Sequence, residues 1–218
     1  VARYTIRKTI QLYSKSGIGF HSNDTRILNS VDDNNLLTRS INSDVGIQLK
    51  LFQNLLFHSG LWYIDLEDEL VYVGDEGIVE SSGHTRRKGI EIGARMQPNN
   101  WLFLEAEGSY TIAKIADANE GNNHIPLASK WCSSGGIYFE NIGNFSLGIR
   151  YRLLGDRPAN EDNSIVAKGY TLLDANLNYS LKNLKFSLIT ENILNRQWNE
   201  AQFATLSRLK NELNPVEE

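Results

Sequence analysis

The chain has 218 residues, of which 41% are hydrophobic and 10% aromatic, so it can form one large folded region. Its net charge is −4, from 22 basic and 26 acidic residues, and no segment is strongly basic, which disfavours nucleic-acid binding. No run approaches the roughly 18 consecutive apolar residues of a transmembrane helix, and the mean hydropathy is −0.36. Cys132 is the only cysteine, so no disulfide can form within the chain.

Alternation of apolar and polar residues with a period of two recurs along the chain and predicts β-strands. In the first run, Ile10 and Leu12 alternate with Gln11 and Tyr13. Residues 55–72 are more apolar and their phase is left open. The pattern predicts about nine strands, the others lying within 43–52, 88–96, 101–111, 129–139, 145–154, 170–179 and 184–192.

Residues 88–110 read as a β-hairpin with two different faces. Ile90 and Ile92 share a face with Leu102 and Leu104, whereas the opposite face carries glycines and full charges. The charged face is a poor candidate for a dry core. The apolar face therefore needs a covering other than water.

The connections between the predicted strands are alternately short and long. In a meander, every second connection lies at the same end, so one rim of the sheet has tight turns and the other has long loops. This asymmetry is typical of outer-membrane barrels. The short connections lie around 53–54, 98–100, 141–144 and 182–183, and the long ones at 21–40, 73–83, 113–126 and 155–168.

These patterns predict an all-β fold, an antiparallel up-and-down meander that forms a partial wall of a large transmembrane β-barrel. Many runs reach about ten residues, which is the length of a strand that crosses a bilayer. Lipid would cover the apolar face and the charged face would line the lumen. Two alternatives stay open, a soluble β-sandwich that binds a ligand and a passive porin-like barrel. Aromatic residues near strand ends are expected at the membrane interfaces, namely Trp101, Phe103, Tyr110, Phe139, Phe145 and Tyr179.

Several motifs, in this order and spacing, resemble the C-terminal half of the barrel of TonB-dependent receptors. They are SKSGIGFHSNDTR (14–26), WYIDLEDELVYVGDEG (62–77), TRRKGIEIGARMQPNNWLFLEAEGSYT (85–111), IPLASK (125–130) and GYTLLDANLNYSLKNLKFSLITENILNRQW (169–198). The resemblance covers nearly the whole chain. It implies a single region, 1–218, within a roughly 22-strand barrel, from which the plug domain and the last strand are missing.

The resemblance also implies a location and a set of partners. Receptors of this family lie in the outer membrane of Gram-negative bacteria, among lipid and lipopolysaccharide. They import siderophores, other metal chelates, cobalamin or oligosaccharides with energy that TonB delivers through the N-terminal plug domain. The expected partners are therefore these lipids, the plug, TonB and a small-molecule ligand, and the intact receptor is expected to be a monomer.

Two groups of residues are candidates for function. Residues in long loops would form an outward-facing ligand surface, although a polar loop start is an alternative explanation for the first four: His21, Asn23, Asp24, Arg26 and His124. Charged and polar residues on the lumen face would contact water or the plug. They are Glu91, Arg95, Glu105, Glu107, Arg150, Arg152, Asp174, Asn176 and Glu191.

Other charged clusters carry weaker signals. The acidic run at 65–69 could chelate a cation, but it has no glycine-punctuated calcium loop. Arg86, Arg87 and Lys88 could bind lipopolysaccharide phosphates or anchor a strand at the membrane interface. The histidines lack the spacing of a metal site, and no nucleophile, base and orienting group stand together. We therefore expect no metal, no cofactor and no catalysis.

Overall fold

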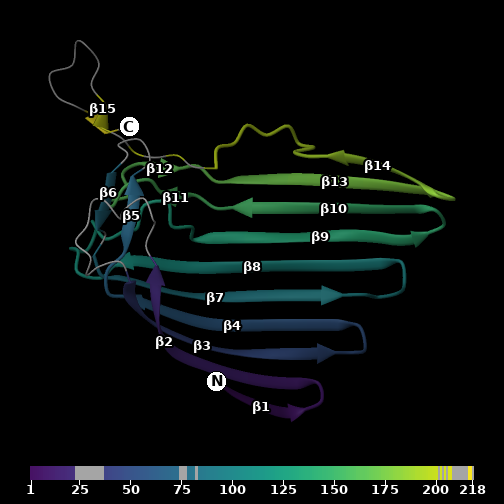
Figure 1. The fold of residues 1–218 in the computed structure, drawn as a ribbon, viewed down its shortest axis with the longest axis horizontal. Helices are drawn as coiled ribbons and strands as arrows, with labels where there is room; N and C mark the ends of the chain where they lie inside the picture. Colours follow the sequence, from purple (N-terminus) through teal and green to yellow (C-terminus); the bar gives the residue numbers. More distant parts are fainter. Residues whose placement is uncertain are drawn as a thin grey trace.

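The computed structural model describes residues 1–22, 37–73, 78–81 and 83–200, and positions 202, 204, 206–207 and 216–217. Ten strands form one sheet, in which every pair of neighbours is antiparallel (Figure 1). In sheet order they are β1 (Ala2–Arg7), β2 (Ile10–Ser22), β3 (Leu37–Leu51), β4 (Leu55–Leu66), β7 (Thr85–Met96), β8 (Leu102–Ile115), β9 (Trp131–Ile142), β10 (Phe145–Leu154), β13 (Tyr170–Leu181) and β14 (Leu184–Thr190).

Three two-stranded sheets accompany the large one. The pairs are β5 (Leu70–Val73) with β6 (Ile78–Ser81), β11 (Arg157–Pro158) with β12 (Val166–Ala167), and β15 (Leu206–Ser207) with β16 (Val216–Glu217). The first two lie within long connections of the meander. In the part of the chain that the structure describes, no helix is long and apolar enough to span a membrane.

The predicted difference between the two rims of the sheet is confirmed. Tight turns join the strands at the right of Figure 1, and the long connections gather at the left. Asn and Gly form these turns as expected, since Asn141 and Gly143 adopt φ values of 56° and 59°, which favour such residues. The Asn99 side chain accepts hydrogen bonds from the backbone N–H groups of Trp101 and Leu102, at 3.1 and 2.9 Å.

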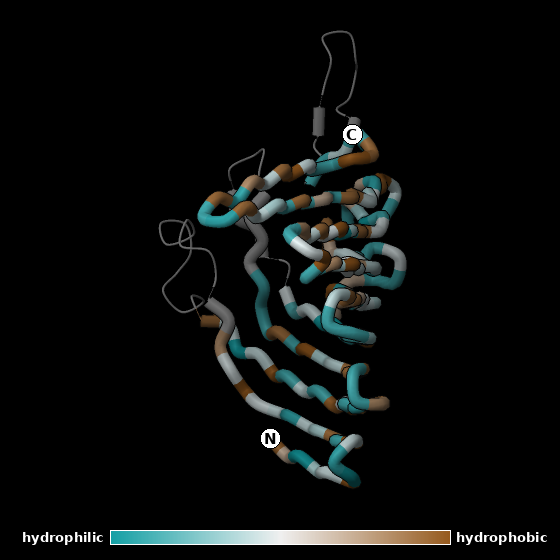
Figure 2. The backbone as a smooth tube through the Cα atoms, turned by 90° about the vertical axis from the view of Figure 1, so that its right-hand side faces the viewer, coloured by the Kyte–Doolittle hydropathy of each residue, from teal (hydrophilic) through white to brown (hydrophobic). Residues whose placement is uncertain are grey.

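Residue-by-residue pairing gives the sheet two different faces. On β7 and β8, Ile92 pairs with Gly108 and Glu91 pairs with Ser109. We call the side that bears Ile92 the apolar face and the side that bears Glu91 the polar face. Figure 2 shows the alternation as brown and teal segments along the strands, and it shows that the sheet is curved.

The apolar face is not covered by a second layer in the described residues. Ile18, Leu61, Ile92 and Leu188 are 66%, 57%, 46% and 64% exposed. Extended contacts between strands join only neighbours in a sheet. This arrangement contradicts the alternative of a β-sandwich, whose two sheets bury their facing sides against each other.

The buried residues gather at the rim of the long connections. Leu66 and Ile115 end β4 and β8, and Leu172 lies at the start of β13. These side chains share the rim with buried residues of the loops, so the loops and not a second sheet form the core. The buried loop residues are Ile125, Arg157, Ala159, Asn160 and Ala167.

The structure differs from the sequence-based expectations in the number of strands, and it fixes the phase of β4, which the sequence left open. The large sheet has ten strands and not nine, because residues 2–22 form two strands joined at Lys8 and Thr9. Residues 55–66 form β4, with Phe57 and Leu61 on the apolar face and Trp62 on the polar face.

Phe103 does not join the aromatic residues of the apolar face. It pairs with Tyr138 on the polar face, and the two ring centroids lie 5.8 Å apart. The reason is parity, because Phe103 is an even number of positions from Glu105 and so shares its face.

Several glycines of the polar face lie beneath ring side chains. The Tyr13 ring lies over Gly46 and its hydroxyl lies over Gly60, where a methyl group would be 2.7 Å from that oxygen. A methyl group at Gly89 would lie 2.6 Å from the Trp62 ring and 2.5 Å from the Tyr110 carbonyl oxygen. Residues without a side chain thus let the rings lie flat along the sheet.

We expect Gly89→Ala to destabilise the folded protein by about 1–3 kcal/mol, because the added methyl group meets both a ring and a backbone oxygen. Gly17→Ala is the matched control, since nothing lies within 4 Å of a methyl group at that position. It should leave the stability unchanged or raise it by up to about 1 kcal/mol. Urea unfolding in detergent micelles measures both changes, and equal losses would contradict the packing argument.

Candidate functional site

The polar face brings together eight of the nine residues predicted to line a lumen. Register places Arg95 of β7 opposite Glu105 of β8, and Glu105 opposite Gly136 of β9. Gly136 lies opposite Arg150 of β10, which lies opposite Asp174 of β13. These five positions form one row across five strands. Glu107, Arg152, Asn176 and Glu91 occupy the same face in neighbouring rows, and Glu191 follows the end of β14.

Arg95 is held between two carboxylates. Its Nη2 donates to Glu107 Oε1 at 2.8 Å, and its Nε lies 3.8 Å from Glu105 Oε2. The Tyr138 hydroxyl donates to the other oxygen of Glu105 at 2.8 Å. Because the Arg95 side chain is 53% exposed, each ion pair contributes no more than about 1 kcal/mol. The group is hydrated and its contacts can be exchanged at low cost.

Arg150 differs from Arg95 in its surroundings. Its side chain is exposed and forms no ion pair with another described residue, although Asp174 lies opposite it. Asp174 instead accepts a hydrogen bond from the Asn192 backbone N–H at 2.8 Å. The guanidinium of Arg150 therefore has donors available for a group outside this sheet.

The segment that follows β14 returns along the polar face. Arg152 lies over the Trp198 ring, with 5.7 Å between the guanidinium carbon and the ring centroid. The Tyr170 and Trp198 rings are 4.8 Å apart, and the Tyr170 hydroxyl donates to Glu200 Oε2 at 3.0 Å. These contacts fix residues 198–200 beside the ends of β10 and β13.

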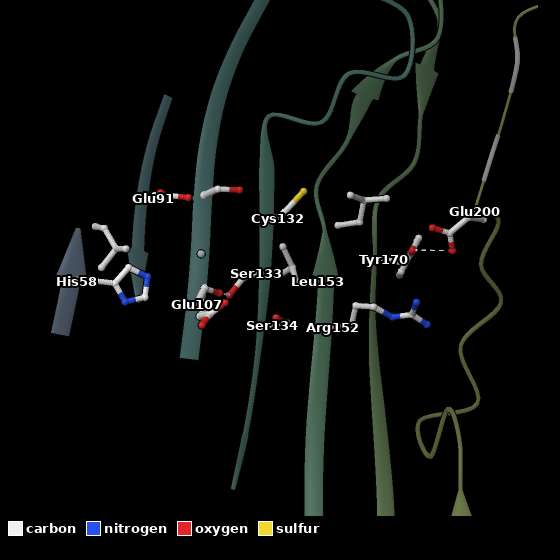
Figure 3. Close-up of a pocket in the computed structure, with 14 residues that line it drawn as sticks. His58, Glu91, Glu107, Cys132, Ser133, Ser134, Arg152, Leu153, Tyr170 and Glu200 are labelled. Carbon is white, nitrogen blue, oxygen red and sulfur yellow. Dashed lines mark hydrogen bonds between the residues drawn. The ribbon is translucent and has the colours of Figure 1, made fainter. Parts of the chain in front are cut away.

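A hollow of about 440 Å³ lies on the polar face between β4 and the segment after β14 (Figure 3). Its lining is mixed, with carboxylates, an imidazole, a guanidinium, hydroxyls and a thiol. Such a surface can hold a hydrated polar group. The polar side chains of this face that line it are His58, Glu91, Glu107, Ser109, Cys132, Ser134, Arg152, Tyr170 and Glu200.

The acidic run at 65–69 pairs with arginines and a histidine. Asp65 accepts a hydrogen bond from Arg86 Nε at 3.0 Å and lies 2.8 Å from His84 Nε2. Glu67 pairs with Arg39 at 3.1 Å. The carboxylates thus meet positively charged or hydrogen-bonding partners from other strands and loops.

Glu69 forms the less exposed part of this rim. Arg87 Nη2 donates to both of its carboxylate oxygens, at 2.6 and 2.7 Å, and the buried Thr85 hydroxyl donates to one of them at 2.9 Å. These partners leave little room for a cation at this carboxylate. Among the described residues, no group of three or more His, Cys, Asp or Glu side chains could hold a metal ion.

His124 joins two of the long connections. Its Nε2 lies 3.1 Å from Lys114 Nζ, and its Nδ1 lies 3.1 Å from the Glu161 carbonyl oxygen. Since the ammonium group can only donate and the carbonyl can only accept, Nε2 accepts and the Nδ1–H donates. Both ring nitrogens therefore have partners within the chain.

The neighbouring loop turns tightly at Asp162. The Ser164 backbone N–H and hydroxyl donate to Asp162 Oδ1 at 2.9 and 2.7 Å. These two hydrogen bonds hold the pKa of the Asp162 carboxyl below its ordinary value. The carboxylate therefore stays charged at neutral pH and shapes the loop.

Of the first group of predicted ligand residues, the structure describes one. His21 belongs to β2, and its backbone pairs with Thr38. Asn23, Asp24 and Arg26 lie outside the described residues.

Sequence reasoning did not select Tyr138, Tyr170, Trp198 or Glu200. Tyr138 could have been found, because it shares the parity of the polar face with Gly136. Trp198 and Glu200 follow β14 in a segment with no strand period, so alternation could not place them.

Residues 2–193 match the family described as TonB dependent receptor-like, β-barrel. The ferrioxamine receptor of Yersinia enterocolitica is 30% identical to the chain over 138 residues, which are 57% of this chain and 19% of that receptor. The family match includes all ten strands of the large sheet. It confirms the resemblance seen in the sequence motifs.

Solved receptors show the same fold. The ferric yersiniabactin uptake receptor FyuA of Yersinia pestis superposes with a TM-score of 0.74 at 14% identity, over 99% of this chain and 34% of that one. The ferric-catecholate import receptor Fiu of E. coli K12 gives a TM-score of 0.69 at 18% identity, over 90% of this chain and 30% of that one. The chain thus spans about a third of these receptors. It belongs to the TonB-dependent receptor-like β-barrel family, whose members lie in the outer membrane of Gram-negative bacteria.

Proposed function

We propose that residues 1–218 form part of the C-terminal portion of the barrel wall in a receptor that imports a scarce ligand across the outer membrane. Membership of a receptor family agrees with the expectation that the chain is not an enzyme. The observation that carries the proposal is the division of ten paired strands into an apolar and a polar face. Hydrocarbon would cover the first face and a wide lumen would adjoin the second.

Aromatic pairs near both ends of the strands support this orientation. Tyr110 and Trp131 lie 4.7 Å apart towards the rim of long connections. Trp101 and Phe139 stack at 6.2 Å, and Phe145 and Tyr179 lie 4.6 Å apart, near the tight turns. Aromatic side chains favour the two interfaces of a membrane, so the hydrocarbon layer would lie between these pairs.

Basic residues at the rim fit lipopolysaccharide as a lipid partner. Lys88 is exposed on the apolar face, opposite Tyr63 of β4 and Ile112 of β8. Arg86 lies two residues earlier on the same face and pairs with Asp65. Their position on the side of the long connections would bring both cations to the level of lipid phosphates.

The open edges of the sheet support a partial wall. Among the described strands, β1 and β14 each pair with one neighbour only. An unpaired strand edge in hydrocarbon is costly, because no water can satisfy its backbone groups. In the membrane, these edges would have to pair with further strands, and the closed receptor would be a monomer.

The polar face would contact the plug domain, through which TonB acts. Arg150 is exposed and has donors available, and Arg95 is held by two glutamates. Hydrated contacts of this kind can hold a plug at rest and yield when it is pulled, because each exposed pair is weak. The same face carries Glu91, Arg152, Asp174 and Asn176, which would contribute to this surface.

The names of the relatives favour a siderophore or another metal chelate over cobalamin or an oligosaccharide. They include receptors for ferrioxamine, ferric catecholate and ferric yersiniabactin. We propose His21, Asn23, Asp24 and Arg26 as ligand contacts. His124 is a weaker candidate, because a ligand that used its ring would have to displace Lys114 or the Glu161 carbonyl.

Replacement of Ile92 by Arg tests which face meets lipid. An arginine on a lipid-facing mid-strand position should cost about 2–4 kcal/mol of folding free energy in a bilayer. Ser109→Arg is the control, since it places the same charge at mid-strand on the polar face beside Glu91 and should cost less than about 1 kcal/mol. Equilibrium refolding of the intact receptor in lipid vesicles measures both. A larger loss for Ser109→Arg would reverse the assignment of the faces.

Replacement of Arg150 by Ala tests the contact with the plug. Because Arg150 is exposed, loss of its contact should weaken plug retention by up to about 1 kcal/mol. Arg150→Lys keeps the charge and serves as the control, and Arg95→Ala should have the smaller effect because Glu105 and Glu107 already occupy that guanidinium. Protease protection of the plug and ligand uptake by cells are the readouts. Unchanged retention and uptake in Arg150→Ala would count against the proposed contact.

A further inference from the structure

A hollow of about 340 Å³ interrupts the apolar face across β7, β8 and β9, and we call it the apolar hollow. Small residues of neighbouring strands form its floor. Ala94 pairs with Ala106, and Gly108 lies between Ile92 and Ser133 in the next row. The wall is therefore thinner here by about one side chain, and the space opens to the side on which we expect lipid.

Larger side chains border the apolar hollow along the strands. Towards the long connections, the rings of Tyr110 and Trp131 lie 4.7 Å apart. Towards the tight turns, Leu104 pairs with Ile137. Leu104 is six residues from Tyr110, so the two borders are about 20 Å apart along β8. This length suits an extended hydrocarbon chain.

The hydroxyl groups at the floor have partners within the wall. Ser133 Oγ donates to the Glu107 carbonyl oxygen at 2.8 Å and lies 2.9 Å from the Tyr151 hydroxyl oxygen. Since the proton of Ser133 is used, the Tyr151 hydroxyl donates to Ser133. Hydrocarbon can therefore cover both groups without leaving a hydroxyl proton unsatisfied.

Two lysines lie beyond the ring border, on the side of the long connections. Lys88 is two residues from Ile90, which lines the apolar hollow, and it is exposed without an ion pair to another described residue. Lys114 Nζ donates to Asn123 Oδ1 at 2.6 Å, and this neutral partner leaves its charge uncompensated. Lys88 pairs with Ile112, so Lys114 is its diagonal neighbour, with Cβ atoms about 7–8 Å apart. This separation is short enough for one phosphate to contact both ammonium groups.

A second hollow, of about 210 Å³, connects these cations with the apolar hollow. Lys114 and Lys130 belong to its lining, and Tyr110 lines both hollows. Asp65, an acidic residue of the same face, is already paired with Arg86 at 3.0 Å. This part of the apolar face thus places positive charge next to an apolar space, which is complementary to a lipid that carries a phosphate.

We propose that this surface binds one lipopolysaccharide molecule, with a phosphate of its lipid part at Lys88 and Lys114 and one acyl chain in the apolar hollow. The choice of lipid rests on the proposed function, under which the long connections face the outer leaflet. Reversal of the two faces in the Ile92→Arg experiment would remove both proposals. Unchanged lipid binding in the variants below would remove only this one.

Gly108→Leu fills the apolar hollow and tests the acyl-chain contact. The nearest atom to a methyl group at Gly108 is 3.7 Å away, so the wall accommodates the start of the new side chain. Native mass spectrometry of the intact receptor in detergent, titrated with lipid A, should show an affinity about threefold weaker or more, because the acyl chain loses packing contacts. Ala175→Leu is the matched control and should bind as wild type, since Ala175 pairs with Ile149 on the same face outside the hollow. Equal affinities of wild type and Gly108→Leu, or equal losses in the two variants, would overturn the proposal.

Lys88→Gln tests the phosphate contact in the same titration. Loss of one cation near a lipid headgroup should weaken lipid A binding by about fivefold. Lys50→Gln removes a cation from the polar face, where Lys50 pairs with Leu56 and Leu56 with Arg95, and should leave binding unchanged. Full binding by Lys88→Gln would exclude the phosphate contact. Phosphatidylglycerol is the second probe, and binding as tight as that of lipid A would refute the choice of lipopolysaccharide.

A structure of the intact wild-type receptor in lipid nanodiscs that contain lipopolysaccharide needs no variant. It should show an acyl chain over Gly108 and Ser133, and a phosphate within hydrogen-bond distance of Lys88 or Lys114. An empty apolar hollow, or a side chain of a second protein molecule inside it, would rule the site out.

Discussion

Backbone hydrogen bonding between neighbouring strands is the interaction on which the other features of this chain depend. Ten strands satisfy one another's N–H and C=O groups from β1 to β14. Hydrocarbon offers no water to replace these bonds, so a wall in a membrane has to consist of paired strands. Pairing also sets the register. A slip of one residue in β7 would exchange the positions of Ile92 and Glu91, which would put a carboxylate on the lipid side.

A second constraint is that bulky rings on the polar face have to lie flat along the sheet, so that the space above this face stays open. Gly89 and Gly93 of β7 have no side chain, and Trp62 and His58 of β4 lie over them. The rings therefore run along the sheet and not away from it.

Alternation predicted most of the sheet, because side chains of a strand point to opposite faces by geometry alone. It missed the turn at Lys8 and Thr9 for two reasons. Neither residue is typical of a turn. In addition, the two residues of most pairs in the β1–β2 hairpin, such as Tyr4 and Leu12, are an even number of positions apart, so the alternation continues through the turn without a break. The phase of β4 was open since apolar residues occur on both faces. The contacts of Arg157 and Glu200 depend on loops that come together only in the folded chain.

Three arginines show how surroundings decide what the same side chain can do. Arg95 is exposed between two carboxylates, where water screens the charges and the pairs are weak. Arg150 is exposed without an ion pair in the described sheet, so its donors are available at little desolvation cost. Arg157 is buried with two unused donors, and there a counter-charge would act through a medium that screens poorly. Contacts of the two exposed arginines can therefore be exchanged at low cost, whereas the buried guanidinium carries a larger desolvation cost. The difference among the three arginines therefore follows from solvent access and not from residue type.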